Sequence, residues 1–386
     1  IAGICEVNYP QEVTSSFKRM AGFSGEPTDF VRNTLGEIMS SRGDALPVSA
    51  LSVDGTFPTA TTQFEKRCIA LTIPIWEPDL CIQCGQCTMV CPHAVIRFKK
   101  FKQEELEGAP ETFKSAAWRT KEFPGEFMSI QPSPEDCTGC GMCVEVCPAK
   151  DKEVEGRKAI NMTPKEGPLP VESANWKFWA SLPDVPRTDV QIDTMRGSQL
   201  LRPLFEFSGA CAGCGETPYV RLVTQLFGDR MVIANATGCS SIYGGNLPST
   251  PYCVNEDGRG PAWSNSLFED NAEFGFGMRL AMDQQQEYAQ TLLKDLSGEI
   301  GDATVDRLID NPQSTEAEIA EQRKLVADVK AKFEGVDCDK AKALITSADY
   351  LVDRGMWIFG GDGWAYDIGY GGLDHVLASG RNVNIL

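Results

Sequence analysis

The sequence predicts a chain of several domains that combines α+β and α/β architecture. Its 386 residues are more than one hydrophobic core usually holds. One cysteine-rich stretch, residues 79–148, carries the same motif twice, and the last thirty residues read as strand, helix and strand. We therefore expect a small domain built around cysteines, followed by a larger α/β domain with a parallel sheet.

The cysteine-rich stretch carries the spacing C-x2-C-x2-C-x3-C-P twice. In bacterial ferredoxins the first three cysteines of each run ligate one 4Fe-4S cluster, and the fourth ligates the other cluster. The sequence therefore predicts two 4Fe-4S clusters. Their ligands would be Cys81, Cys84, Cys87 and Cys147 for cluster 1, and Cys137, Cys140, Cys143 and Cys91 for cluster 2.

Zinc ribbons and disulfide frameworks are the alternatives for so many cysteines. A zinc ribbon uses two C-x2-C pairs with a long spacer, whereas each run here places four cysteines within eleven residues. A disulfide framework needs an oxidising compartment, and the sequence shows no sign of one. Iron-sulfur ligation fits better, and thiolates committed to iron indicate a reducing cytoplasm.

Composition limits the classes of partner. Lys and Arg number 36 against 54 Asp and Glu, so the net charge is −18, which disfavours nucleic acid and anionic membranes. No apolar run approaches the ~20 residues of a membrane helix. A short basic stretch, Arg97 to Lys102, is interpreted as a solvated face.

Changes in composition and pattern along the chain divide it into four parts. Residues 1–20 are interpreted as the end of an upstream domain, since the chain starts without Met in the middle of a pattern. Residues 21–62 form a Gly-, Pro- and Ser-rich linker domain with a helical stretch near 27–39. The ferredoxin-like domain follows over 63–172, and its aromatic-rich insert, 95–136, should cover a cluster or pack on a neighbour. Residues 173–386 form an incomplete α/β domain.

Within the α/β domain the expected elements follow in order. Residues 171–204, rich in Pro and Trp, are interpreted as an extended crossing segment. A helix should span 218–227, with Pro218 in its first turn, and a buried strand 231–236 should end in the turn 237–241. Residues 283–349 should form an acidic helical insertion with a capping box at Thr315 and Glu318. The end reads as a βαβ unit: strand 356–359, a helix to 378, and strand 381–386.

Two further groups of residues suggest chemistry at the carboxyl ends of the strands, where α/β sheets bind ligands. Cys211, Cys214 and Cys239 are three thiols of a cubane that needs four; a zinc site or simple packing is the alternative. Gly361-Asp362-Gly363 between a strand and a helix suits a pyrophosphate and Mg²⁺. A Rossmann fingerprint does not fit, because Tyr366 stands where the third Gly would be. The remaining cysteines are expected to be small buried side chains: Cys5, Cys68, Cys253 and Cys338.

In order and spacing, these motifs resemble the pyruvate:ferredoxin (flavodoxin) oxidoreductase family over essentially the whole chain. The resemblance rests on the two ferredoxin runs, Cys211-Ala-Gly-Cys214-Gly-Glu-Thr, Ala236-Thr-Gly-Cys239-Ser-Ser and Gly361-Asp-Gly-Trp-Ala-Tyr-Asp-Ile-Gly. It implies that residues 1–20 end a CoA-binding domain and that residues 173–386 are the first half of a doubly wound, thiamine diphosphate-binding α/β domain.

The resemblance also implies roles for individual residues. Cys211, Cys214 and Cys239 would ligate a third 4Fe-4S cluster, proximal to the cofactor, whose fourth ligand lies far beyond Leu386. Glu216 and Cys239 would contact thiamine diphosphate. The diphosphate would be cradled by Gly361, Asp362, Gly363 and Trp364, with Asp362 on Mg²⁺. No catalytic residue is assigned in this chain, since the family's substrate-binding and cofactor-activating groups belong to other domains.

The activity that the resemblance implies is oxidative decarboxylation of pyruvate with CoA to acetyl-CoA and CO2. Electrons would pass through three 4Fe-4S clusters to ferredoxin or flavodoxin, in a cytoplasmic homodimer that binds neither nucleic acid nor membrane. Two alternatives stay open: an oxidoreductase of the same kind acting on another 2-oxo acid, and a non-catalytic iron-sulfur electron carrier.

Overall fold

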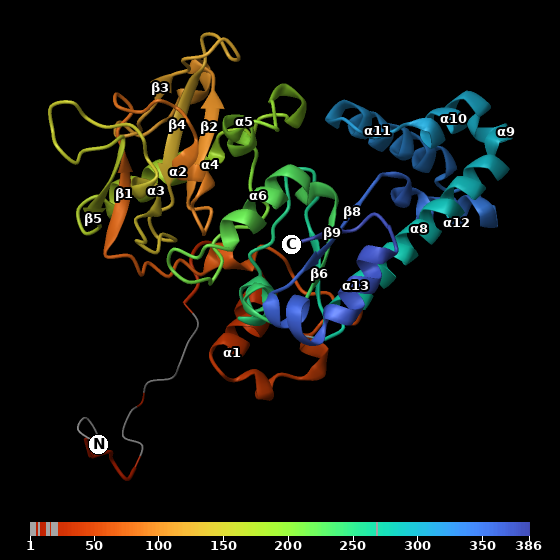
Figure 1. Ribbon diagram of the computed structural model, residues 1–386, viewed down its shortest axis with the longest axis horizontal. Helices are drawn as coiled ribbons and strands as arrows, with labels where there is room; N and C mark the ends of the chain where they lie inside the picture. The colour runs from red at the N-terminus through yellow and green to blue at the C-terminus, as the bar shows by residue number, and fades with distance from the viewer. Residues whose placement is uncertain (1–4, 7, 13–15, 17–21, 268) are drawn as a thin grey trace. The chain divides into compact units, whose positions relative to one another are not determined.

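A computed structural model describes residues 1–386 except 1–4, 7, 13–15, 17–21 and 268 (Figure 1). The chain divides into two compact units, residues 1–57 and 58–386. The predicted end of an upstream domain, over 1–20, lies largely outside the described residues.

The first unit contains short helices at the predicted helical stretch. A π-helix, η1 (Val31–Leu35), continues into α1 (Gly36–Met39), and two 3-10 turns follow, η2 (Gly43–Ala45) and η3 (Val48–Ala50). Val31 and Leu35 are buried. The ring of Phe30 meets that of Phe57 edge to face, with 5.0 Å between centroids.

The cysteine-rich part of the second unit consists of loops and short helices between two antiparallel sheets. After η4 (Thr61–Phe64), β1 (Thr72–Trp76) pairs with β5 (Ile160–Pro164). The helices α2 (Gln86–Met89) and α3 (Met142–Glu145) each begin after a glycine with positive φ, Gly85 or Gly141, which a residue with a Cβ adopts less easily. Each of the two cysteine runs thus forms a loop followed by a short helix.

The aromatic-rich insert forms the second sheet, with strand order β2-β4-β3. Its elements are β2 (Ile96–Phe101), η5 (Gln103–Leu106), β3 (Ala116–Ala117) and β4 (Phe127–Pro132). Phe98 stacks on Trp118, which meets Phe123 edge to face. The insert therefore packs into the core that holds the buried cysteines, as predicted.

Residues 171–204 are not an extended segment, so that prediction is wrong. They contain most of α4 (Leu169–Ser181), η6 (Arg187–Asp189) and α5 (Met195–Leu200). The prolines misled the prediction, because they flank short helices: Pro183 follows the end of α4, Pro186 precedes η6, and Pro203 follows α5. Trp176 and Trp179 stack on each other, 5.1 Å apart.

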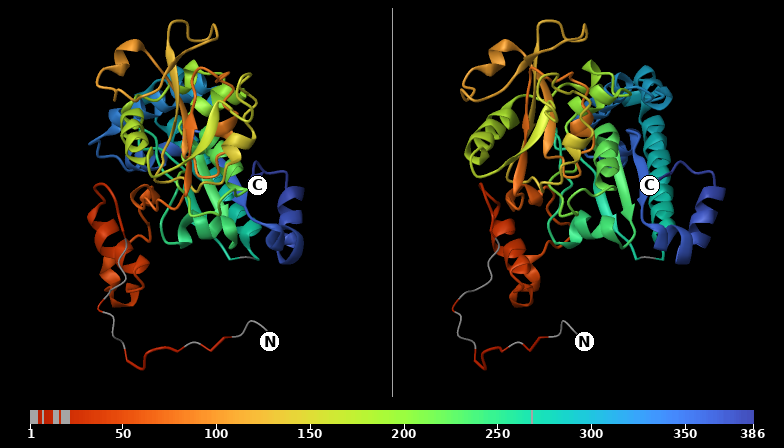
Figure 2. Two further views of the ribbon diagram at one scale, coloured as in Figure 1. Left: turned by 90° about the vertical axis from the view of Figure 1, so that its left-hand side faces the viewer. Right: turned by 60° about the vertical axis from the view of Figure 1, so that its left-hand side comes forward.

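The carboxyl-terminal part contains, within the described residues, a parallel sheet of order β7-β6-β8-β9 (Figure 2). Its strands are β6 (Met231–Asn235), β7 (Ala262–Asn265), β8 (Gly355–Phe359) and β9 (Asn384–Ile385). On one face, α6 (Thr217–Phe227) packs against Met231, Ile233 and Phe359. On the other face, α8 (Asn271–Asp295) and α13 (Tyr370–Ala378) pack against Ala234 and Ile358. Helices on both faces of a parallel sheet, together with the β8-α13-β9 unit, confirm the predicted mixed α/β architecture.

The predicted helical insertion is confirmed and has a core of its own. It consists of the end of α8 with α9 (Ser297–Ile300), α10 (Asp302–Asp310), α11 (Glu316–Phe333), α12 (Asp339–Ser347) and η9 (Ala348–Leu351). The capping box is present: the backbone N of Glu318 donates to Thr315 Oγ1, and the Glu318 carboxylate accepts from the Thr315 N. Among the helices of the described residues, none combines the length and apolar content needed to cross a membrane.

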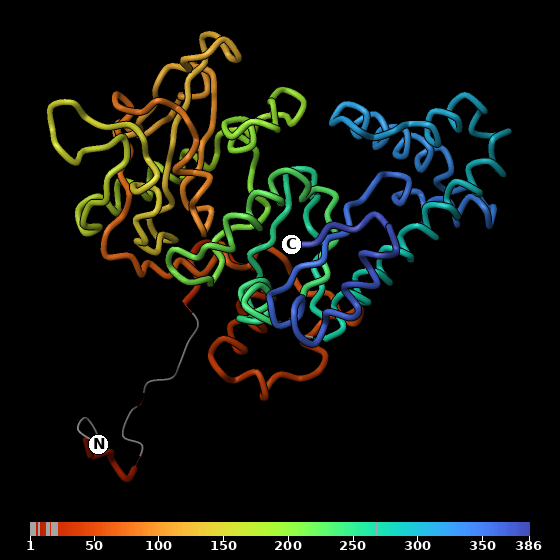
Figure 3. The backbone as a smooth tube through the Cα atoms, in the orientation of Figure 1, coloured from red at the N-terminus to blue at the C-terminus, as the bar shows by residue number. Residues whose placement is uncertain are grey.

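Short helices at the ends of strands complete the description. They are η7 (Gly228–Arg230), α7 (Cys239–Ser241), η8 (Ile242–Asn246) and η10 (Gly363–Ile368). Figure 3 traces the backbone from the cysteine-rich part through α5 into α6 and the parallel sheet.

Candidate iron-sulfur and cofactor sites

The eight cysteines of the ferredoxin runs line two pockets, four cysteines to each. One pocket is lined by Cys81, Cys84, Cys87 and Cys147. The other is lined by Cys91, Cys137, Cys140 and Cys143. Each pocket takes three cysteines from one run and the fourth from the other, which is the partition that the spacing predicts.

Backbone amides point at the cysteine sulfurs in both pockets. The N–H groups of Gln83, Val95 and Gly139 donate to Cys81, Cys91 and Cys137, with N–S distances of 3.3, 3.3 and 3.4 Å. Such amides stabilise negative charge on sulfur, and hydrogen bonds to sulfur are one determinant of cluster potential. Both pockets therefore fit a negatively charged group held by thiolates.

Burial disfavours the thiolate form of these cysteines. It raises the pKa of Cys81, Cys87 and Cys143, and it raises the pKa of Cys137 to about 12. A bound metal would keep the sulfurs as thiolates and release their protons. No group of three His, Cys, Asp or Glu side chains in the described residues is arranged to hold a single metal ion. The eight cysteines instead converge four by four on the two pockets.

The insert lies directly over the loop of the first pocket. Gln83 Nε2 donates to the carbonyl oxygen of Ala117, at 2.8 Å, and the backbone N of Arg119 donates back to Gln83 Oε1. Arg119 Nη1 also donates to the carbonyl of Cys81, at 2.6 Å. The insert therefore shields one wall of the cluster 1 pocket from solvent.

The third group of cysteines lies next to the second pocket. A Cβ placed on Gly213, in the loop between Cys211 and Cys214, would be 3.8 Å from the Cβ of Cys140. Cys211 is exposed and Cys214 half-buried, and the backbone N of Cys214 donates to the carbonyl of Cys211 at 3.1 Å. A redox group on this loop would therefore be close to the cluster 2 pocket.

A hydrogen bond ties that loop to the helix that begins at Cys239. The hydroxyl of Tyr243, one turn after Cys239, donates to Glu216 Oε1 at 2.6 Å. Burial, and then this bond, raise the pKa of Tyr243, so the hydroxyl stays a donor. Glu216 is exposed at the start of α6, and Cys239 is exposed at the end of β6. The structure thus brings Cys214, Glu216 and Cys239 into one neighbourhood.

The Gly-Asp-Gly turn lies at the same edge of the sheet. Asn235 and Phe359, the last residues of β6 and β8, are partners in register, and the N of Ala236 donates to the carbonyl of Phe359. The turns after the two strands, with Cys239 and Asp362, are therefore neighbours. Asp362 is exposed immediately before η10, whose first amides face outward from the helix start.

The side chain of Trp364 does not face this turn. It is 1% exposed and packs in the core between the sheet and α13. Only its backbone amide is available for the role that the resemblance assigns to it. The exposed turn itself, with a carboxylate and outward amides, fits a diphosphate and its cation.

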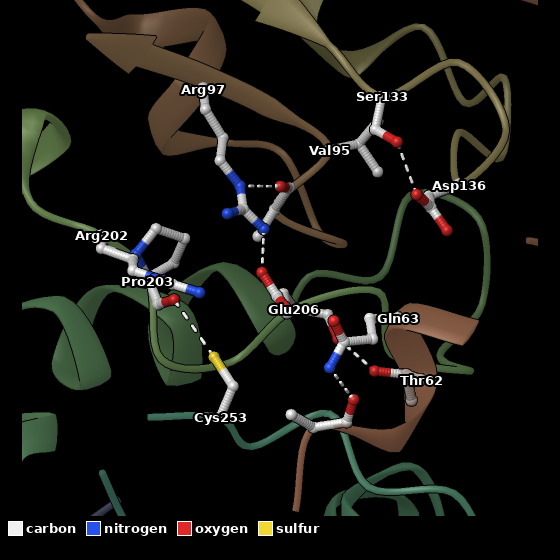
Figure 4. A network of polar contacts seen from close by, with 12 residues as sticks. Thr62, Gln63, Val95, Arg97, Ser133, Asp136, Arg202, Pro203, Glu206 and Cys253 are labelled. Carbon is white, nitrogen blue, oxygen red and sulfur yellow. Dashed lines mark hydrogen bonds and ion pairs between the residues drawn. The ribbon is translucent and has the colours of Figure 1, made fainter. Parts of the chain in front are cut away.

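The basic stretch is a buried contact rather than a solvated face, so the prediction is wrong for its first residues. Arg97 pairs with Glu206, in the segment that leads to Cys211 (Figure 4). Lys99 pairs with Asp184. Thr62 Oγ1 also donates to the backbone carbonyl of Glu206, at 2.8 Å. Charges that looked free in sequence are partnered by residues about a hundred positions away.

Other residues near the pockets have no signal in the sequence. His93 is 2% exposed, lines the second pocket, and places Nδ1 3.1 Å from the carbonyl of Ser208. Burial lowers its pKa, so the neutral ring is favoured. Its position after Cys91-Pro92 was the one available hint. Among the scattered cysteines, Cys253 is buried as expected, whereas Cys5 is exposed, contrary to the prediction.

Comparisons with known proteins place this chain beside a group of large oxidoreductases. Residues 80–150 match a family described as a 4Fe-4S dicluster domain, and residues 18–70 match EKR, described as a domain of unknown function.

The chain is similar over nearly its full length to curated relatives. It is 56% identical to a putative pyruvate-flavodoxin oxidoreductase of Synechocystis, over 100% of the chain and 32% of that protein. It is 50% identical to a probable pyruvate-flavodoxin oxidoreductase of Escherichia coli, over 93% of the chain and 30% of that protein. It is 49% identical to the pyruvate:ferredoxin oxidoreductase of Moorella thermoacetica, over 99% of the chain and 32% of that protein. The chain thus spans about a third of the length of these relatives.

Proposed function

We propose that this chain, homologous along nearly its whole length to a third of a pyruvate-flavodoxin oxidoreductase, is the electron-transferring and part of the cofactor-binding region of such an enzyme. The whole protein would convert pyruvate and CoA to acetyl-CoA and CO2 and pass the electrons to ferredoxin or flavodoxin. The single observation that carries the proposal is this homology over nearly the whole chain.

The ligand assignment follows the two pockets. Cys81, Cys84, Cys87 and Cys147 would hold cluster 1, and Cys91, Cys137, Cys140 and Cys143 would hold cluster 2. Cys211, Cys214 and Cys239 would contribute three ligands to a third cluster. The closeness of the Gly213 loop to Cys140 supports an electron path in which the third cluster is followed by cluster 2 and then by cluster 1.

The neighbouring turns at the sheet edge would bind thiamine diphosphate. When bound, that cofactor supplies the electron sink for decarboxylation of a 2-oxo acid. The amides of Gly363 and Trp364 would face the diphosphate, Asp362 would contribute to its Mg²⁺, and Glu216, held by Tyr243, would meet the ring end beside Cys239. This geometry would place the oxidised substrate carbon next to the third cluster.

The surroundings of the sites suit this role. The chain is acidic, with a net charge of −18. We expect it to act in the cytoplasm, where thiols remain reduced, and as part of a homodimer. Nucleic acid and membrane are not expected partners.

Anaerobic dye reduction tests the proposal with the full-length protein that contains this chain. Pyruvate, CoA and thiamine diphosphate are added, and 2-oxoglutarate then replaces pyruvate. Reduction with pyruvate and not with 2-oxoglutarate is expected. Preference for 2-oxoglutarate would reassign the substrate within the same class of enzyme. No reduction with either acid, on protein with its full iron content, would leave an electron carrier in place of the proposed enzyme.

A further inference from the structure

Arg221 is a buried cation without a carboxylate partner. Its side chain is 1% exposed, on α6 of the parallel-sheet domain, and it reaches into the cysteine-rich part. Nη1 donates to the backbone carbonyls of Thr88 and, at 3.2 Å, Met89, and Nη2 donates to Gln199 Oε1. In the described part of the chain, no Asp or Glu forms an ion pair with it, and its Nε–H has no acceptor.

The carbonyls that Arg221 contacts lie between the two cysteine pockets. Thr88 and Met89 are the last two residues of α2, which connects Cys87 to Cys91. Cys87 lines the cluster 1 pocket and Cys91 lines the cluster 2 pocket. Burial lowers the pKa of Arg221 to about 10, and the Cys91 and Cys87 sulfurs act in the opposite direction. The guanidinium is therefore hydrogen-bonded to the short segment that joins the two pockets.

A buried charge of this kind requires compensation. Taking a guanidinium out of water is costly unless opposite charge and hydrogen bonds replace the solvent. The two carbonyls and the amide of Gln199 are neutral dipoles. The charge of Arg97 also acts against that of Arg221, and Arg97 itself pairs with Glu206. Two clusters, each held by four thiolates and negatively charged as a whole, would provide the missing countercharge.

We propose that Arg221 is a positioning and potential-setting residue shared by clusters 1 and 2, whose positive charge stabilises the reduced form of both. The proposal rests on the ligand assignment given under the proposed function. Each cluster takes up one electron and gains one negative charge, so a nearby cation raises its reduction potential. Because α6 starts three residues after Cys214, Arg221 also fixes the loop of the third cluster relative to the other two.

The test is a redox titration of the full-length protein and two variants, with dithionite as reductant and the clusters followed by electron paramagnetic resonance. In Arg221→Gln, which keeps hydrogen-bond donors but removes the charge, both ferredoxin clusters should become harder to reduce. We expect the ratio of reduced to oxidised cluster at a fixed potential to fall about tenfold, equivalent to about 59 mV for a one-electron couple. Arg221→Lys, which keeps the charge, should retain potentials close to those of the wild type.

The matched control is Arg187→Gln. Arg187 also donates to two carbonyls at a helix end, those of Gln225 and Leu226, but it pairs with Glu316 and does not adjoin the pockets. Its loss should leave all cluster potentials unchanged.

Three results would overturn the proposal. The first is Arg221→Gln with both clusters present at wild-type potentials. The second is Arg221→Lys with potentials as low as those of the Gln variant. The third is loss of iron from both variants, which would mean that Arg221 only maintains the fold. If Arg221→Gln loses iron, the Arg221→Lys variant decides the question. Iron content and potentials equal to those of the wild type in Arg221→Lys would then support the role of the charge. Dithionite reduces the clusters without pyruvate, so these results do not depend on whether the protein oxidises pyruvate.

Discussion

At the scale of single residues, the decisive feature is that the fourth cysteine of each run lines the pocket formed by the other run. Cys147 stands four residues after Cys143 in sequence, yet it lines the pocket of Cys81, Cys84 and Cys87. This exchange makes the assignment of each cysteine testable one by one.

Cys147→Ser should therefore remove cluster 1 and leave cluster 2, although Cys147 belongs to the second run. Cluster loss is measured from iron content and from the cluster signals after dithionite reduction of the full-length protein. The control, Cys143→Ser, should remove cluster 2 instead. If both variants lost the same cluster, the crossed ligand assignment would be wrong.

Asp362 is the residue on which the proposed cation site depends. Asp362→Asn removes the charge that would hold Mg²⁺ at the sheet edge, so we expect thiamine diphosphate to be retained at least about tenfold more weakly. Asp367→Asn is the control, because Asp367 is also exposed on η10 but five residues away from the turn. Cofactor affinity is measured by titration of the full-length apoprotein. Equal affinities in Asp362→Asn and the wild type would contradict the assignment.

At the scale of elements, the position of α8 against the sheet depends on one glycine. A Cβ placed on Gly275 would lie 2.5 Å from Ile358 Cγ1 and 3.3 Å from the Cβ of Ala234, on β8 and β6. Two residues along the same helix, a Cβ on Gly277 would meet nothing within 4 Å. Substituting Gly275 therefore tests close packing against the sheet, whereas substituting Gly277 tests helix propensity alone.

Gly275→Ala should push α8 away from the sheet and destabilise this contact by roughly 1–3 kcal/mol. Gly277→Ala should instead stabilise the helix by roughly 0.5–1 kcal/mol, because alanine loses less backbone entropy there. Amide hydrogen exchange of α8, β6 and β8 in the full-length protein measures both effects. Equal protection in the two variants would show that Gly275 does not set the distance between helix and sheet.

At the scale of the whole molecule, the proposal places the three cysteine groups in a series from the sheet edge to the insert. Arg97 with Glu206, and Arg221 with the end of α2, hold the cysteine-rich part on the segments that carry Cys211 and Cys214. The proposed electron transfer would therefore depend on contacts between parts that are distant in sequence.

Cys239→Ala should interrupt that series at its start. In the full-length protein we expect dithionite to reduce clusters 1 and 2 as in the wild type, while pyruvate no longer reduces them. Cys253→Ala is the control, since Cys253 is buried and its sulfur contacts only the carbonyl of Pro203 among the hydrogen-bond partners described. Normal reduction of both clusters by pyruvate in Cys239→Ala would remove the third cluster from the proposed path.

Much of the site could be predicted from sequence because its chemistry is local. Cluster ligation requires thiols at short, regular spacings, and the strand–turn–helix patterns around Cys239 and Asp362 are set by neighbouring residues. The strands β6 and β8, the helix α6 and the capping box of α11 were all found in this way. The error over residues 171–204 arose because prolines that flank short helices resemble prolines in extended chain.

Local sequence patterns therefore sufficed to predict 4Fe-4S clusters and to nominate the cysteines that would hold them. Only the tertiary structure decided which charges are buried and what they face. Arg97 and Lys99 look like a solvated patch, and Arg221 like one side chain of an amphipathic helix, until partners far along the chain are in place. The physical reason is that desolvation and ion pairing depend on distances in space, which no local pattern of residues encodes.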